Sequence, residues 1–106
     1  MRHMAELPAK FFAVAADHPI FAGHFPGRPI VPGVMLLEWV VAEVSLALGR
    51  APSAFRVREA KFFQPLAPGQ RAQLHVDPGG TPARCSFDIR CEATAIARGI
   101  LEWDGV

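Results

Sequence analysis

A histidine and a carboxylate fourteen positions apart are the residues of this sequence best suited to chemistry. Between His24 and Val34 lie three prolines and two glycines, and Glu38 follows within an apolar stretch. An imidazole titrates near neutral pH and suits a general base. A carboxyl group removed from water tends toward the protonated form that can donate a proton. The pair therefore predicts general acid–base catalysis, with a proline-stiffened loop that holds the histidine.

A helix over residues 32 to about 48 is predicted to position Glu38. Proline near its start and Gly49 just past its end are typical of helix boundaries. The stretch is apolar nearly all round, so we expect the helix to be buried on most sides. The amides of Gly33 and Val34 have no acceptor within the helix, and the helix dipole there favours negative charge. We predict that these two amides stabilise a developing oxyanion.

The rest of the sequence predicts strands. One strand is expected before the helix and four after it, at residues 10–15, 55–63, 71–76, 84–91 and 93–103. The alternation slips at Glu59 and Ala60, which indicates a bulge. Small residues on one face of the last strand, ending at Gly99, would let the helix approach the sheet closely. The pattern predicts a single α+β domain over residues 1–106, with an antiparallel sheet wrapped around one long helix.

Composition limits the possible partners. The hydrophobic fraction of 51% leaves apolar surface for an oligomer interface, and we expect a dimer. A net charge of +1 with scattered Lys and Arg argues against nucleic acid and anionic membrane. The N-terminus lacks the pattern of a secretory signal, and the longest apolar stretch is interrupted by Glu38. A cytoplasmic protein is expected.

The two cysteines and the histidines indicate neither a disulfide nor a metal site. Cys85 and Cys91 would lie about 20 Å apart on one strand, too far for a disulfide, so two buried, reduced thiols are expected. No histidines or cysteines have the short spacing that zinc sites use, and no glycine-rich phosphate loop follows a strand. Neither metal nor cofactor is expected.

The segment from His24 to Glu38 resembles the active-site signature of the β-hydroxyacyl-acyl carrier protein dehydratases of the hotdog fold. It reads His-Phe-Pro-Gly-Arg-Pro-Ile-Val-Pro-Gly before the helix and keeps the family's spacing to the carboxylate. Residues 60–69 also resemble the strand and turn that follow the family's helix. At Ala42 the sequence departs from the glutamine usual in the family. The loop residues that we expect to orient the histidine are Phe25, Pro26, Pro29, Ile30 and Pro32.

The resemblance implies dehydration of a 3-hydroxyacyl thioester on acyl carrier protein to the trans-2-enoyl thioester, in fatty-acid or specialised polyene or polyketide synthesis. It implies a homodimer or higher even oligomer in which His24 of one chain meets Glu38 of the other, and a cis peptide before Phe25. Three alternatives stay open. The chain could be a hotdog acyl thioesterase or the non-catalytic subunit of a hotdog heterodimer, or Glu38 could be a structural carboxylate paired with Arg28 or Arg98.

Several other polar residues have plain structural interpretations. His18 precedes a proline and is expected in a turn, and His75 belongs to the outward row of its strand. Arg56, Arg58 and Lys61 could form a basic docking face for an acidic carrier protein. A solvated strand face explains the same three residues.

Overall fold

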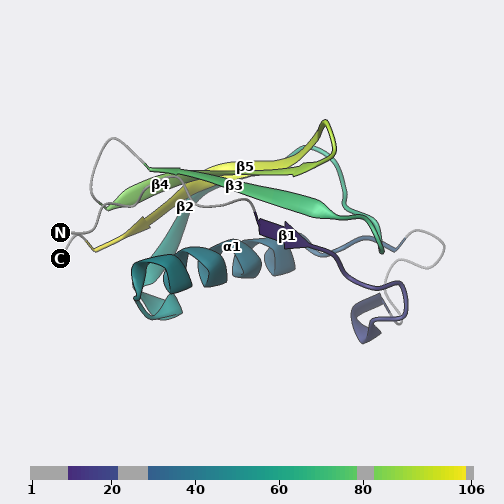
Figure 1. Ribbon diagram of the computed structural model, residues 1–106, viewed down its shortest axis with the longest axis horizontal. Helices are drawn as coiled ribbons and strands as arrows, with labels where there is room; N and C mark the ends of the chain where they lie inside the picture. The colour runs from purple at the N-terminus through teal and green to yellow at the C-terminus, as the bar shows by residue number, and fades with distance from the viewer. Residues whose placement is uncertain (1–9, 22–28, 79–82, 105–106) are drawn as a thin grey trace.

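The computed structural model describes residues 10–21, 29–78 and 83–104. Within them, five strands form one antiparallel sheet in the order β1-β3-β4-β5-β2, and helix α1 lies along one of its faces (Figure 1). The strands are β1 Lys10–Phe12, β2 Phe55–Phe62, β3 Ala72–Pro78, β4 Arg84–Cys91 and β5 Thr94–Trp103. The helices are α1 Gly33–Leu48 and two short 3-10 turns, η1 Pro19–Phe21 and η2 Pro52–Ala54. The predicted α+β architecture is confirmed.

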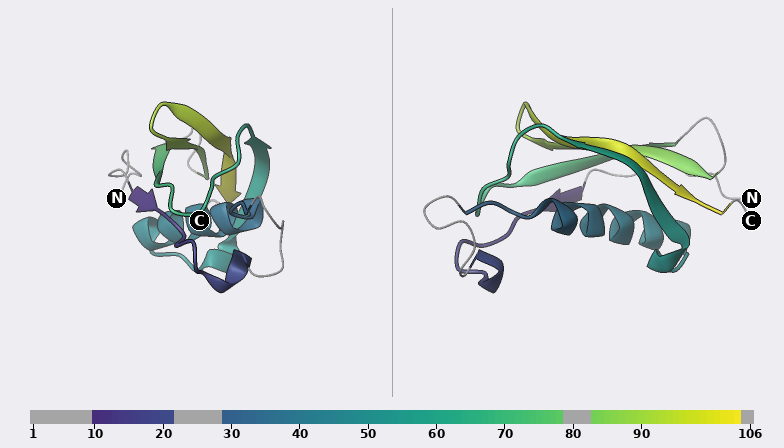
Figure 2. Two further views of the ribbon diagram at one scale, coloured as in Figure 1. Left: turned by 90° about the vertical axis from the view of Figure 1, so that its right-hand side faces the viewer. Right: turned by 180° about the vertical axis from the view of Figure 1, so that it is seen from behind.

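Two bulges bend the sheet around the helix. In β2 the pairing with β5 slips between Val57 and Glu59, so Arg58 is the extra residue, close to the predicted slip. In β5 the pairing with β4 slips at Ile96, so Ile96 and its neighbour Ala97 are both buried. A bulge bends its strand and increases the local twist. Figure 2 shows the resulting sheet curving over α1.

One stripe of α1 is left exposed in the single chain. The residues buried on the side facing the sheet are Leu36, Val40, Val44 and Ser45. The exposed residues, four apart along the helix, are Val34, Glu38, Ala42 and Leu46. The prediction of a helix buried on most sides holds except along this exposed stripe, because further residues of the helix pack partly buried against the core, among them Met35, Leu37, Trp39, Val41 and Leu48.

Gly99 is small for a reason other than helix packing. A Cβ at this position would collide with the carbonyl oxygen of Glu59 and with the ring of Phe87. Because Gly99 pairs with Ala60 next to the β2 bulge, a side chain there would disturb the strand pairing itself. Gly99 was expected to let the helix approach the sheet, whereas the structure shows that it is needed for packing between strands of the sheet.

The C-terminal end of α1 is anchored by backbone and hydroxyl contacts. Gly49 adopts a left-handed conformation with φ 67°, which suits a residue without a Cβ. The buried hydroxyl of Ser45 donates to the carbonyl oxygen of Arg50 at 2.5 Å. Nearer the start of the helix, the ring of Trp39 stacks on Phe12 of β1 with centroids 4.8 Å apart. The first two contacts close the C-terminal end of the helix, and the aromatic stack joins the helix to β1.

Candidate functional site

Only some of the predicted site residues belong to the described part of the chain. His24, Phe25 and Pro26 lie outside the described residues, as does the peptide bond for which a cis geometry was predicted. Pro29, Ile30, Pro32, Gly33, Val34 and Glu38 are described. The part of the loop that enters α1 is held in place because the amide of Val31 donates to the carbonyl oxygen of Leu66 at 2.8 Å.

The first turn of α1 begins with two amides, those of Gly33 and Val34, that are free of acceptors within the described part of the chain. The carbonyl oxygen of Pro32 accepts from the amides of Met35 at 3.0 Å and Leu36 at 3.4 Å. Among the described residues, no carbonyl accepts from the amides of Gly33 and Val34. These donors and the positive end of the helix dipole can stabilise an anionic oxygen.

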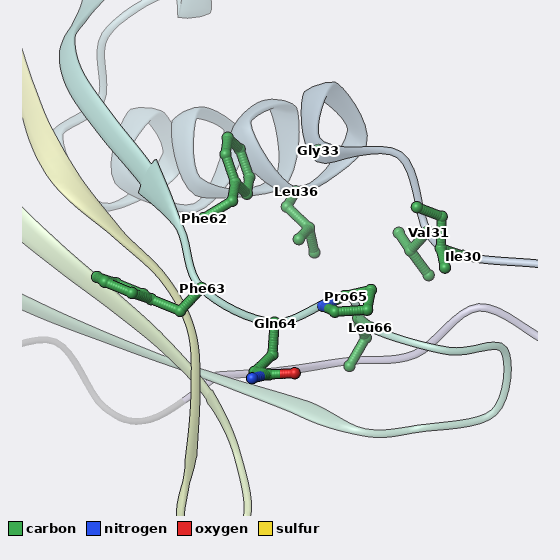
Figure 3. Close-up of a pocket in the computed structure, with 9 residues that line it drawn as sticks. All are labelled: Ile30, Val31, Gly33, Leu36, Phe62, Phe63, Gln64, Pro65 and Leu66. Atoms are coloured by element: carbon green, nitrogen blue, oxygen red, sulfur yellow. The ribbon is translucent and has the colours of Figure 1, made fainter.

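An apolar pocket of about 330 Å³ opens beside this turn (Figure 3). The loop and helix contribute Ile30, Val31, Gly33 and Leu36, and the end of β2 with the segment after it contributes Phe62, Phe63, Gln64, Pro65 and Leu66. Its volume lies at the small end of the range for ligand pockets, roughly 300–1,000 Å³. The position of a pocket beside free amides suits a ligand with an apolar chain and a carbonyl group.

Glu38 does not face this pocket in its own chain. It follows Leu36 by two residues, which corresponds to a rotation of about 200° around a helix. Leu36 lines the pocket, whereas Glu38 is exposed on the opposite side of α1. The expectation that Glu38 is desolvated by its apolar helix is therefore wrong for the single chain, because its neighbours on that face are also exposed.

Arg98 does not pair with Glu38. Its Nε donates to Asp88 at 3.1 Å, and Arg90 donates to the other oxygen of Asp88 at 2.7 Å. Burial by itself raises the pKa of Asp88, but hydrogen bonds and charge from these two arginines bring the pKa below its ordinary value. The structural alternative with Arg98 is thus wrong, and Arg28 lies outside the described residues.

The predicted basic face on β2 is largely ion-paired. Glu102 of β5 lies 3.6 Å from Arg56, 3.5 Å from Arg58 and 3.3 Å from Arg84. Lys61 is exposed. Since Arg56 and Arg58 share one carboxylate, this surface matches the solvated strand face better than a strongly basic docking face.

The remaining candidates have structural roles. His18 lies in a turn, where its Nδ1 accepts from the amide of Ile20 at 3.0 Å, and His75 is exposed on β3. Both cysteines are free. Cys85 is buried, and burial raises the pKa of its thiol to about 11, whereas Cys91 is only half-buried.

The sequence analysis missed the residues that close the pocket from the sheet side. Phe62 and Phe63 were treated only as part of a strand, although two consecutive aromatic residues put one ring on each face of a sheet. Among the described residues, no cluster of three or more His, Cys, Asp and Glu could hold a metal ion, and no helix is long and apolar enough to cross a membrane.

Comparison with known proteins identifies the family. The ApeI-like family model, described as ApeI dehydratase, matches residues 4–100. The chain belongs to this family. It is also similar to two 3-hydroxyacyl-[acyl-carrier-protein] dehydratases named FabZ. The relative from Rhizobium rhizogenes is 36% identical over 94 residues, covering 79% of this chain and 60% of the relative. The relative from Novosphingobium aromaticivorans is 40% identical over 74 residues, covering 61% and 47%.

Solved structures share the hotdog fold. The dehydratase heterocomplex ApeI:P from Xenorhabdus doucetiae superposes with a TM-score of 0.70 at 23% identity, covering 96% of this chain and 97% of that one. A 1,4-dihydroxy-2-naphthoyl-CoA thioesterase from Synechocystis has a TM-score of 0.56 at 13% identity, covering 88% and 77%. The predicted fold and the resemblance to hotdog dehydratases are confirmed. The chain spans about half the length of the curated FabZ relatives that it matches.

Proposed function

We propose that this protein dehydrates a 3-hydroxyacyl thioester on acyl carrier protein to the trans-2-enoyl thioester, in the cytoplasm. The observation that carries the proposal is the apolar pocket beginning at Gly33, beside two free amides of the first turn of α1. An acyl chain fits such a lining, and the amides suit a thioester oxygen on which charge develops. Membership in a dehydratase family and similarity to the FabZ relatives support the same reaction.

The proposed step is an acid–base elimination. His24 takes the proton from C2, the C2–C3 double bond forms, and the C3–O bond breaks while Glu38 donates a proton, so that the hydroxyl group leaves as water. The amides of Gly33 and Val34 stabilise the charge on the thioester oxygen. The loop residues around His24 aim its imidazole, and the step needs neither metal nor cofactor.

We further propose that the catalytic pair comes from two chains. Within one chain Glu38 and the pocket lie on opposite sides of α1, so the pocket and its own Glu38 do not meet in the single chain, and Glu38 of a second chain would complete the pair. Val34, Ala42 and Leu46 make the side that carries Glu38 largely apolar. The described part of β2 pairs with β5 on one side only, which leaves an edge for contact with a second chain. A homodimer or even-numbered oligomer satisfies this arrangement, and so does a heterodimer of hotdog subunits.

The reaction is tested by following 3-hydroxyacyl and trans-2-enoyl thioesters on carrier protein with mass spectrometry. We expect His24→Ala and Glu38→Gln each to lower turnover at least about 10²-fold, with unchanged unfolding. The double variant should lose far less than the product of the two effects. Glu43→Gln removes another carboxylate from α1 and serves as the matched control.

Each alternative predicts a different result. If both single variants keep wild-type turnover, the two residues leave the mechanism. A wild-type chain that forms enoyl product only after a second hotdog subunit is added would favour the non-catalytic subunit. Release of free thiol from the acyl thioester without formation of the enoyl product would instead identify a thioesterase.

Mixing the two inactive variants tests the shared site. If each site takes His24 from one chain and Glu38 from the other, co-refolded His24→Ala and Glu38→Gln chains form mixed dimers with one intact site. Activity should then return to roughly a quarter of the wild-type value, as expected for random two-fold pairing. Sites contained within one chain would recover nothing on mixing.

A further inference from the structure

The ring of Phe62 stands against the start of α1. A Cβ built on Gly33 would lie 2.9 Å from its Cζ and 3.0 Å from its Cε1, well inside van der Waals contact. In Figure 3 the ring extends from the end of β2 toward the helix, beside Gly33 and Leu36. A side chain at residue 33 would therefore require the ring of Phe62 to move aside. Phe62 thus occupies the space directly beside one of the two free amides.

The backbone that carries this ring is fixed, whereas the ring itself is not enclosed. Phe62 pairs with Ala97 in β5, and the amide of Phe63 donates to the carbonyl oxygen of Ile96 at 2.8 Å. The side chain of Phe62 is nevertheless 50% exposed. The ring can therefore leave Gly33 only by side-chain rotation, a motion that is fast for exposed residues.

The ring of Phe63, the next residue, points away from the start of α1 (Figure 3). The ring of Phe63 lies 5.7 Å from the guanidinium carbon of Arg98, and Figure 3 shows it directed away from Gly33. The strand alternation thus gives the two phenylalanines different surroundings, and only Phe62 touches the turn that carries the free amides.

We propose that Phe62 is a positioning residue for the acyl thioester. In the free protein its ring covers the backbone at Gly33. When the thioester oxygen takes the amides, the ring rotates aside and packs on the acyl carbons next to the carbonyl group, which holds C2 within reach of the base and keeps water out. The inference rests on the proposed function, because the ligand is the substrate of that reaction.

Kinetics of Phe62 variants test this role, with turnover expressed per folded site. Misplacement of a substrate by about 1 Å can cost 10²-fold, so we expect Phe62→Ala to lower kcat about 10- to 100-fold with a smaller change in KM. Phe62→Leu, which keeps part of the contact, should recover part of the loss. Phe11→Leu is the matched control, since Phe11 is also half exposed, at 51%, but lies on β1.

A second measurement reports on the ring directly. With 4-fluorophenylalanine in the protein, addition of an acyl-pantetheine amide, in which nitrogen replaces the thioester sulfur, should shift the fluorine resonance of Phe62 and leave that of Phe11 unchanged. The Phe62→Leu spectrum assigns the resonance. This readout does not depend on any alanine variant folding.

The outcomes separate this inference from the function on which it rests. A wild-type protein that forms no enoyl product contradicts the proposed function itself. An active wild type with wild-type kcat in folded Phe62→Ala, or with an unshifted Phe62 resonance, would show that the ring only packs against the helix. A fall in kcat together with a shift would support the positioning role.

Discussion

The two faces of α1 have similar composition and different surroundings. Toward the sheet, Leu36, Val40 and Val44 are at most 2% exposed. Away from it, Val34 is 65% and Leu46 79% exposed, on the same side as Glu38. Apolar side chains on the first face stabilise the fold, because folding removes them from water. Those on the second face gain nothing until another surface covers them, so they are available for assembly.

Substitution of a leucine on each face should give the largest difference. Leu36→Ala removes a buried side chain and should lower the free energy of unfolding by about 2–5 kcal/mol. In the unassembled chain, Leu46→Ala removes the same atoms from an exposed position and should cost less than about 0.5 kcal/mol. Urea unfolding measures the contrast, at protein concentrations low enough to keep both variants monomeric. Equal losses would mean that the two faces are not different in solution.

High pH should lower the free energy of unfolding, because a thiol is buried in the core on the covered side of α1. Cys85 is buried in the sheet beneath α1, and its thiol pKa rises from 9.0 to about 11. Below pH 9 the thiol is protonated in both states. Between pH 9 and 11 the unfolded chain loses this proton first, so unfolding becomes easier, by about 2–3 kcal/mol in total.

Urea unfolding across this pH range measures the effect, and the sequence contains no tyrosine to titrate beside it. The Cys85→Ala variant should lose stability less steeply than wild type. The same pH dependence in both proteins would contradict burial of the thiol.

A charge on the exposed face should weaken assembly. In Leu46→Asp a carboxylate would have to be buried between two helices, so we expect self-association to weaken at least about tenfold, equivalent to 1.4 kcal/mol. Sedimentation equilibrium measures it, and Gln73→Glu on the outer strand surface is the control. Unchanged association in Leu46→Asp would exclude this face from the interface.

Restoring a glutamine beside Glu38 should have the smallest effect. Ala42 is one helical turn beyond Glu38, and glutamine there can donate to a carboxylate at i,i+4. We expect Ala42→Gln to raise turnover less than tenfold, since such a pair contributes only about 0.2–0.5 kcal/mol. Stability should stay within about 0.5 kcal/mol of wild type. Lower turnover in this variant would mean that the site is adapted to alanine.

Local chemistry explains why much of the fold could be predicted. Pro32 and Gly49 are strong helix-boundary signals, and α1 runs from Gly33 to Leu48 between them. The broken alternation near Glu59 corresponds to a real bulge, because an extra residue must interrupt the two-residue period. The first strand was predicted too long, since β1 is limited to the three residues that pair with β3.

The sequence by itself determined which residue types were available for chemistry, because imidazole, carboxyl and helix-start amides have their properties wherever the chain places them. It also determined the helix and most strands, whose signals are local. Only the tertiary structure decided that Glu38 faces away from the pocket of its own chain, and that the ring of Phe62 lies against Gly33. The physical reason is that an almost wholly apolar helix has no polar side to indicate which face meets the sheet. The contact between residues 33 and 62 depends on how β2 returns along the helix, and no local pattern records that path.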